Sequence, residues 1–343
     1  MNKIIIEMEK IKDPYSGLGQ FCLHLANELL PHNDISFYLP KREQALFPLK
    51  KTIEQKKIHK TISFLAPKAQ VWHSIHQDSP YYPSNRDAKY LLTIHDLNYI
   101  FENKDIKKTE DYLKKLQKKI KRADGITFIS EYTKNLVKQF FSIDNIPQKV
   151  IYNGICFKEG LEPQKPEGIP EGEFLFSVGT LLPKKNFHVL VDMLKHLPND
   201  NIVLAGSLFH PYAQEIKNNI SKLGLEKRFI LLGTITEAEK IWLHQNCKAF
   251  LFPSLLEGFG LPVAEAMAQG KPLFLSRLTS LPEVGGVDAF YFDDFEGESM
   301  ASVITQGLNH FTNEQKERLL KRAQIFNWKK AANDYYEFYK GFL

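Results

Sequence analysis

Cysteine is scarce in this sequence, and the three cysteines (Cys22, Cys156 and Cys247) form no Cys-x-x-Cys pair. Such widely separated cysteines exclude a disulfide framework and a cysteine-type zinc site. No run of 18 apolar residues occurs, so no membrane-spanning helix is expected. The first apolar run is short and is followed at once by Glu7, which does not fit a signal peptide. We therefore expect a protein of the reducing cytoplasm.

What is present is the composition of an ordinary globular protein. The 343 residues are 43% hydrophobic and 25% charged, and this length suggests two domains at roughly 100–200 residues each. The net charge of +5 is uneven, because residues 1–170 carry +7 and the remainder carries −2. A basic first half favours an anionic membrane surface or an acidic acceptor as partner. No nucleic-acid motif accompanies the charge, so we expect no nucleic acid.

Short apolar runs alternate with longer amphipathic stretches along the whole chain. Stretches such as 20–30 and 237–246 place their apolar residues on one helical face. The alternation predicts an α/β fold with a parallel sheet flanked by helices in each half. The predicted strands are 4–6, 35–39, 69–72, 90–94, 125–129 and 150–151 in the first half, and 174–178, 202–205, 229–232, 249–252 and 272–275 in the second.

A proline- and glycine-rich segment separates the two halves. Residues 159–172 contain three prolines and three glycines and few apolar side chains. This composition is typical of a linker. We expect a first domain over residues 1–160 and a second over 172–324, with a ligand site at the carboxyl ends of the strands.

The segment that starts at Phe252, FPSLLEGFGLPVAE, combines a strand end, a glycine-rich turn and a helix start. Pro262 stands where the first helical turn should begin. The backbone N–H groups and helix dipole there would form an anion site suited to a diphosphate. Glu257 and Glu265 bracket that site and would repel an anion unless they accept hydrogen bonds from hydroxyl groups. A sugar and a ribose would supply them; alternatively, Glu257 is a solvated loop residue and Glu265 only complements the dipole.

Two lysines follow a Gly-Thr turn at the end of a predicted strand. Lys184 and Lys185 can place positive charge next to a departing diphosphate. The alternative is a solvated Lys-Lys pair before a helix. Gly17 and Gly19 follow the first strand, but Cys22 stands where a dinucleotide fingerprint needs its third glycine, so a dehydrogenase is disfavoured.

The string EGFGLPVAE resembles the E-x7-E motif of family 4 retaining glycosyltransferases. These enzymes have the GT-B fold, in which two Rossmann-like domains face each other across a cleft. Residues 176–186, 128–131, 150–154 and 280–284 also resemble segments of that family. The resemblance implies that Glu257 contacts donor-sugar hydroxyls, that Glu265 binds the ribose, and that the lysine pair binds the diphosphate. The implied donor-binding residues are Gly17, Gly19, Thr180, Lys184, Lys185, Glu257, Gly258, Phe259, Gly260, Leu261 and Glu265.

The resemblance also implies a catalytic set of His95, Glu257 and Lys185. The family has a histidine near the donor sugar at the position of His95, whereas a lone histidine is more often structural. In the family, a glycine-rich loop closes over the donor, and we favour Gly19 because a side chain there would block close approach. The chain lacks Asp-x-Asp, and His73-x-x-His76 has no evident third ligand. We expect no metal and no other cofactor.

Residues 104–122 contain nine basic and three acidic residues beside an apolar stripe. The segment is interpreted either as a solvated helix packed through its stripe, or as a contact with an anionic membrane surface. At the carboxyl end, Trp328, Tyr335 and their neighbours form an aromatic stripe at helical spacing. Family members end in a helix that returns to the first domain, so residues 325–343 are assigned there; the alternative is a helix that completes the second domain.

The resulting hypothesis is a retaining hexosyltransferase of surface polysaccharide assembly of the bacterial type. GDP-mannose is the first choice of donor, because the lysine-pair segment resembles mannosyl- and rhamnosyltransferase branches. The acceptor is a saccharide or a lipid-linked saccharide, and the enzyme is cytoplasmic or peripheral on the inner face of the membrane. Two alternatives stay open: a sugar-nucleotide epimerase or hydrolase on the same fold, and a non-catalytic sugar-nucleotide-binding subunit.

Overall fold

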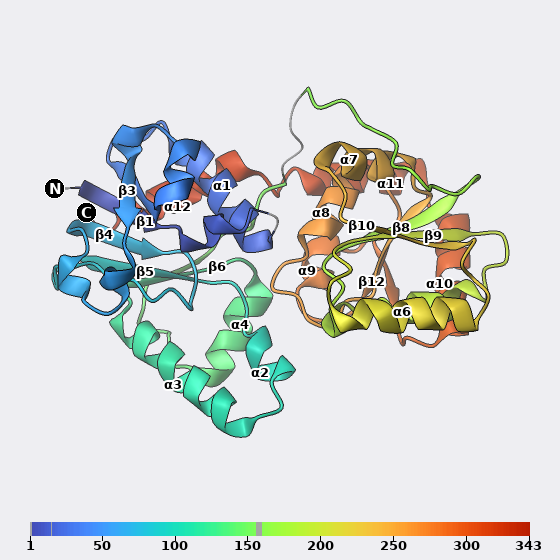
Figure 1. Cartoon of the computed structure of the whole chain (residues 1–343), viewed down its shortest axis with the longest axis horizontal. Coiled ribbons are helices and arrows are strands. Elements are labelled where there is room, and N and C mark those ends of the chain that lie inside the picture. Colours follow the sequence, from blue (N-terminus) through green and yellow to red (C-terminus); the bar gives the residue numbers. More distant parts are fainter. Residues whose placement is uncertain (1, 15, 156–159) are drawn as a thin grey trace. The chain divides into compact units, whose positions relative to one another are not determined.

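The computed structural model describes residues 2–14, 16–155 and 160–343, and the chain divides into two compact units (Figure 1). The first unit comprises the chain up to Gly154 together with Phe326–Leu343, and the second comprises Ile155–Ile325. Cys156 and Glu159 lie outside the described residues. Each unit has its own parallel sheet and its own buried core, and each is described by itself.

The first unit is built on a seven-stranded parallel sheet in the order β3-β2-β1-β4-β5-β6-β7. This is the doubly wound order, in which β2 and β3 are added on one side of β1 and the strands from β4 onward are added on its other side. The strand order therefore reverses between β1 and β4. Ile4, Ile5 and Ile6 are fully buried because strands of such a sheet are covered on both faces. The strands are β1 (Asn2–Glu7), β2 (Ile35–Pro40), β3 (Thr52–Gln55), β4 (Ala69–Ser74), β5 (Lys89–Ile94), β6 (Gly125–Phe128) and β7 (Gln148–Val150).

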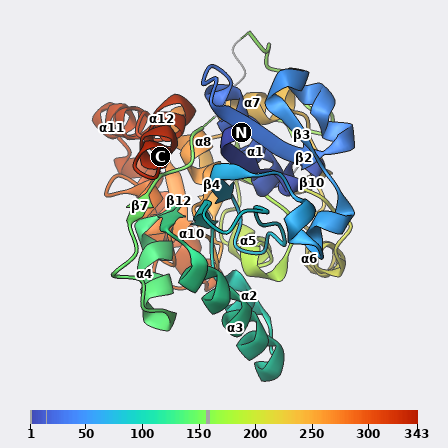
Figure 2. The same ribbon diagram turned by 90° about the vertical axis from the view of Figure 1, so that its left-hand side faces the viewer.

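Four α-helices of the first unit, α1, α3, α4 and α12, begin at side chains that cap them. Ser16, Asp105, Ser130 and Asn327 each accept a hydrogen bond from a backbone N–H group in the first turn that follows. Figures 1 and 2 show α2 and α3 next to each other at one edge of this unit. The α-helices are α1 (Gly17–Leu29), α2 (Asn98–Glu102), α3 (Ile106–Arg122), α4 (Glu131–Phe140) and α12 (Trp328–Lys340).

The final helix, α12, packs on the first unit. The Trp328 ring lies 5.5 Å from that of Phe21 on α1. The Tyr339 hydroxyl is 2.8 Å from Nδ1 of His73 on β4. Trp328, Tyr335 and Tyr339 are all buried, so the aromatic stripe of the tail completes the core of this unit.

The second unit has a six-stranded parallel sheet in the order β10-β9-β8-β11-β12-β13. Its strand order reverses between β8 and β11. Its strands are β8 (Phe174–Val178), β9 (Asn201–Ala205), β10 (Phe229–Gly233), β11 (Ala249–Phe252), β12 (Leu273–Ser276) and β13 (Phe290–Phe292). Its α-helices are α5 (Val189–Leu194), α6 (Pro211–Lys222), α7 (Glu237–Asn246), α8 (Leu261–Ala268), α9 (Leu281–Gly285), α10 (Gly297–His310) and α11 (Asn313–Ala323).

The two sheets confirm the predicted α/β class and Rossmann-like topology. Strands β8 and β11 and helix α7 have the predicted bounds. Strands β3 and β13 were not predicted from the sequence; they are outermost strands of three or four residues with partly exposed side chains. Short edge strands carry too little apolar periodicity to be recognised from sequence.

The described part of the proline- and glycine-rich segment lies on the second unit. The backbone N–H of Gln164 donates to the carbonyl oxygen of Ala238 at 3.1 Å, and the Lys165 ammonium lies 5.7 Å from the centre of the Trp242 ring. Gln164 and Lys165 of this segment are therefore held to α7 by specific contacts.

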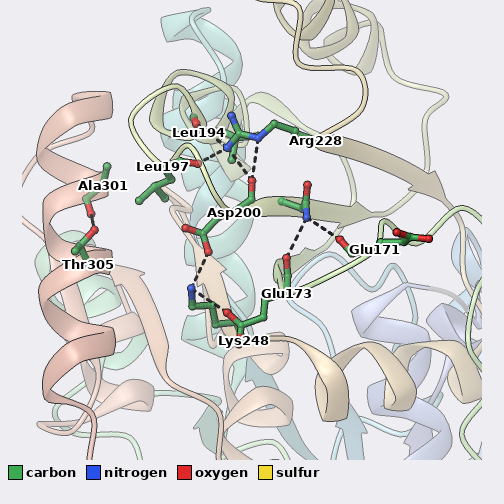
Figure 3. Close-up of polar contacts among 10 residues, drawn as sticks. Glu171, Glu173, Leu194, Leu197, Asp200, Arg228, Lys248, Ala301 and Thr305 are labelled. Carbon is green, nitrogen blue, oxygen red and sulfur yellow. Dashed lines mark hydrogen bonds and ion pairs between the residues drawn. The ribbon is translucent and has the colours of Figure 1, made fainter.

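Arg228 joins β10 to the carboxyl end of α5 (Figure 3). Its guanidinium donates to the carbonyl oxygens of Leu194, Leu197 and Asp200, the last at 2.8 Å. The Asp200 carboxylate in turn pairs with Lys248 at 2.9 Å. Carbonyl groups at a helix end have no partner within the helix, so Arg228 satisfies groups that would otherwise be orphaned.

Replacing Arg228 by methionine should lower the free energy of unfolding of the second unit by about 2 kcal/mol, because partly buried carbonyl oxygens lose their donors. Denaturant titration followed by fluorescence of Trp242, the one tryptophan of this unit, would measure the change. Arg277→Met is the control, since that side chain is 61% exposed and its pair with Asp293 should contribute little. Equal effects of the two substitutions would contradict this account.

Candidate functional site

Two loops of the second unit meet where its strand order reverses. One follows β8 and contains Lys185, and the other follows β11 and contains Glu257. The Lys185 ammonium hydrogen-bonds Oε1 of Glu257 and lies 5.1 Å from the centre of the Phe252 ring. Both side chains are largely buried, at 14% and 11% exposure. The structure thus brings together two side chains that the sequence analysis assigned to catalysis.

The backbone of Lys184 ties these two loops together. Its carbonyl oxygen accepts from the Leu255 N–H at 2.7 Å and from the Ser254 hydroxyl at 3.2 Å. Thr180 is exposed at the start of the same loop. Lys184 therefore contributes to the site through its backbone carbonyl group, which holds the loop that carries Lys185 next to the loop that carries Glu257.

The glycine-rich turn after Glu257 is held by its neighbours. Glu257 N–H donates to the Thr279 hydroxyl at 3.2 Å, and the Ser280 hydroxyl donates to the carbonyl oxygens of Glu257 and Phe259. Gly260 has a φ of 100° and is the N-cap of α8, a conformation that favours glycine. Helix α8 then begins at Leu261 with proline in its first turn, as predicted.

The second glutamate, Glu265, is nearly buried and ion-paired. Its Oε1 lies 2.8 Å from the ammonium of Lys240 on α7, and its Oε2 lies 3.9 Å from Nε2 of His244. Burial raises the pKa of Glu265, and the Lys240 charge opposes that rise. Sequence reasoning missed Lys240 and His244. In the sequence, both residues look like ordinary positions on the surface of a helix. Only the folded structure brings them next to Glu265 of α8.

His95 lies in the first unit, directly after β5, and is buried. Its Nε2 is 2.7 Å from the Ile75 carbonyl oxygen, which can only accept, so Nε2 carries the ring proton and Nδ1 does not. Its backbone N–H donates to the side chain of Gln77. Burial lowers the pKa of His95 to about 4, so its imidazole is neutral at physiological pH.

The two glycines of the first unit differ in their surroundings. Gly19 N–H donates to the Ser16 hydroxyl, and a Cβ there would meet the Asp13 carbonyl oxygen at 1.8 Å. A side chain at Gly17 would enter open space. Close packing against the Asp13 carbonyl group is therefore enough to require glycine at position 19. This reason differs from the predicted one, which was close approach of the donor.

His73 and His76, the pair with a metal-like spacing, have protein partners. His73 bonds the hydroxyls of Tyr339 and Thr93, and His76 Nδ1 accepts from the Asp78 N–H. Among the described residues, no three His, Cys, Asp or Glu side chains are grouped so that they could hold a metal ion.

Comparison with known proteins places these features in a family. The family described as glycosyl transferases group 1 matches residues 161–333, and the one described as glycosyltransferase family 4 matches residues 15–158. O-antigen chain mannosyltransferase B of Escherichia coli is 24% identical, covering 98% of this chain and 99% of that protein. O-antigen chain mannosyltransferase RfbU of Salmonella typhimurium is 25% identical, covering 62% of this chain and 59% of that protein.

Solved structures share the fold at low sequence identity. Sucrose-phosphate synthase from Thermosynechococcus elongatus has a TM-score of 0.76 and 16% identity, covering 99% of both chains. Anabaena HepE in complex with UDP and glucose has a TM-score of 0.73 and 18% identity, covering 99% of this chain and 100% of that one. These matches confirm the predicted GT-B fold, and the family matches confirm the resemblance on which the enzyme class was predicted. The chain belongs to the glycosyl transferases group 1 family and is a glycosyltransferase.

Proposed function

We propose that this hexosyltransferase moves mannose from GDP-mannose to a saccharide acceptor during assembly of a surface polysaccharide, with retention at the anomeric carbon. The contact between Lys185 and Glu257 where the strand order reverses carries the proposal. Relatives that are named O-antigen chain mannosyltransferases support the sugar and the type of acceptor. UDP in the HepE complex supports a nucleoside diphosphate as leaving group.

On the donor side, each residue has a distinct chemical task. The Lys185 ammonium stabilises negative charge on the departing diphosphate, assisted by Lys184, by Thr180 and by the N–H groups at the start of α8. Glu257 accepts hydrogen bonds from donor-sugar hydroxyls, and Glu265 accepts them from the ribose. The turn Gly258–Leu261 lies along the diphosphate. Gly17 and Gly19 of the first unit stay predicted donor-binding residues.

The reaction proceeds through a transition state that resembles an oxocarbenium ion. We propose front-face attack, in which the acceptor hydroxyl forms the new bond to the anomeric carbon, the bond from that carbon to the nucleoside diphosphate breaks, and the hydroxyl proton passes to the leaving phosphate. His95 is neutral, with an unprotonated Nδ1 that can accept a hydrogen bond from a sugar hydroxyl. No step requires a metal ion or another cofactor.

We assign the acceptor to a pocket of about 660 Å³ in the first unit, between α3 and the loop after β4. Tyr99 and Tyr112 pack against each other in its wall, with ring centres 4.8 Å apart and ring planes tilted by 36°, and we propose that they offer apolar surface to a sugar. Gln77 belongs to the same wall and also binds the His95 backbone, which links the pocket to the proposed catalytic residue. The pocket is lined by more lysines than carboxylates, which favours an acceptor that carries phosphate; the charged lining residues are Lys108, Lys115, Lys118 and Lys119 against Asp78 and Asp111.

A lipid-linked acceptor would bring the enzyme to the inner face of the cytoplasmic membrane. No helix in the described ranges is long and apolar enough to cross a bilayer. Eight of the nine basic residues of 104–122 are exposed, and so are the neighbouring Phe101 and Ile106. Lys119 is the exception, because it donates to the carbonyl oxygens of Gln77 and Ser79. We propose that the exposed face of α3 contacts anionic lipid.

The experiment that tests the function offers GDP-mannose and UDP-glucose, with a mannose oligosaccharide as acceptor, and separates transferred sugar from free sugar. We expect α-linked mannose on the oligosaccharide, from GDP-mannose and in the presence of EDTA. Free mannose alone would indicate a hydrolase, an altered nucleotide sugar an epimerase, and binding without turnover a non-catalytic subunit. Each of these three results would overturn the proposal.

A further inference from the structure

The nearly buried carboxylate of Glu265 receives its cation from a different helix. Lys240 of α7 reaches across to Glu265 of α8 at 2.8 Å and also contacts Glu237 of its own helix at 3.1 Å. Lys240 is 16% exposed and Glu265 is 7% exposed. Burial lowers the pKa of Lys240, but the two carboxylates outweigh this and raise the pKa above its ordinary value. Lys240 is therefore charged at every physiological pH.

The other side of Glu265 offers no positive charge. His244 of α7 is fully buried against the rings of Phe176 and Phe250, and burial lowers its pKa to about 3. Neither of its ring nitrogens has a hydrogen-bond partner among the described residues. The groups of α7 that face Glu265 are thus one cation (Lys240), one neutral imidazole (His244) and one further carboxylate (Glu237).

Such an arrangement leaves Glu265 with unused acceptor capacity. An ionised carboxylate has about four lone-pair sites, and the structure gives the hydrogen bond of one donor, Lys240. A buried carboxylate without a cation becomes protonated, and it then loses acceptor capacity and gains a donor. Ribose hydroxyls that donate to Glu265 are held more strongly by the ionised form.

We infer that Lys240 is a positioning residue for the donor, which keeps the Glu265 carboxylate ionised and oriented toward the ribose hydroxyls of the nucleotide. The inference rests on the proposed role of Glu265 and adds a residue that does not itself touch the sugar or the diphosphate. It also explains why a carboxylate can stand beside an anion site, because the ammonium neutralises it.

The test measures the affinity for GDP and for UDP by isothermal titration calorimetry between pH 6 and pH 8.5. In Lys240→Met, we expect GDP to bind at least tenfold more weakly than to the wild type at pH 6, and the deficit to shrink as the pH rises. The sign follows from Glu265, whose pKa rises further when Lys240 is lost, so that the carboxylate is protonated at pH 6 and regains its charge at higher pH. Lys240→Arg should restore affinity to within about threefold at every pH.

Two further variants separate this inference from the proposed function. Lys248→Met is the matched control, because Lys248 also bridges two carboxylates, Asp200 and Glu173, but lies elsewhere in the unit (Figure 3). It should bind GDP like the wild type at every pH. Glu265→Gln should weaken GDP binding by a factor that does not change with pH.

The outcomes are distinct. If neither nucleotide binds the wild type, or if Glu265→Gln binds normally, the proposed donor site is wrong. If Glu265→Gln is impaired but Lys240→Met is not, the role of Lys240 is wrong while the donor site stands. A deficit in Lys240→Met that is the same at every pH, or that Lys248→Met shares, would reduce Lys240 to a structural residue and also overturn the inference.

Discussion

Replacing Lys185 by glutamine should lower the rate of sugar transfer about 100-fold while leaving the second unit folded. The substitution removes the positive charge beside the departing diphosphate, and loss of one such stabilising group typically costs a factor of 10²–10³. The glutamine amide can still donate to Glu257, so the largely buried carboxylate keeps a partner. Turnover under saturating donor is the measurement, with unfolding of the variant followed in parallel.

Glu257→Gln should reduce transfer at least tenfold, and the double variant should be little worse than the Lys185 variant, because contacting residues are not additive. Lys195→Gln is the control, since Lys195 is an exposed lysine of the same unit that pairs with Asp192 at 2.7 Å. A rate within twofold of the wild type for Lys185→Gln would remove this lysine from the diphosphate site. Unfolding of either single variant at room temperature would also reject the assignment.

Replacing Trp328 by alanine should destabilise the first unit by about 3–5 kcal/mol, the usual cost of truncating a buried large aromatic side chain. Trp328 is only 6% exposed and packs on Phe21 and His24 of α1, at ring distances of 5.5 and 5.6 Å. Gly154 also leaves room for it, because a Cβ there would lie 2.2 Å from the backbone nitrogen of Trp328 and 2.4 Å from its Cγ. The indole therefore fills a place in the core of a unit from which it is distant in sequence.

Amide hydrogen exchange would show which unit loses stability in Trp328→Ala. We expect amides of β1 and α1 to lose protection in Trp328→Ala, while amides of β8 and β11 keep theirs. Lys329→Ala changes an exposed neighbour on the same helix and should leave both units unaffected. Loss of protection confined to the second unit would contradict the assignment of α12 to the first.

Much of the fold was readable from local patterns. Buried strands such as β8 and β11 are short apolar runs between turn signals. Helix α7 is preceded by its N-cap Thr236, whose side chain and that of Glu239 form a capping box. The start of α8 follows from Gly260 and Pro262, whose backbone preferences are local properties. Glu257, Glu265 and Lys185 were identified as site candidates because their motifs are contiguous in sequence.

Contacts between distant residues were not readable in this way. Lys240 and Glu265 are 25 residues apart, and His73 and Tyr339 are 266 apart. Lys119 looked like one more basic residue on an exposed helical face, yet it turns inward to the carbonyl oxygens of Gln77 and Ser79. A side chain of that length can reach either solvent or a neighbouring loop, and helical periodicity does not distinguish the two.

Local sequence therefore decides where strands and helices begin and end, because backbone preference and apolar periodicity act over a few residues. It also decides which short segments carry the chemistry. The tertiary structure decides which charge stands beside which: that Lys185 meets Glu257, that Glu265 is buried and needs Lys240, and that His95 is neutral. The physical reason is that ionisation and hydrogen bonding depend on burial and on neighbours within a few ångströms, and only the packed fold creates these.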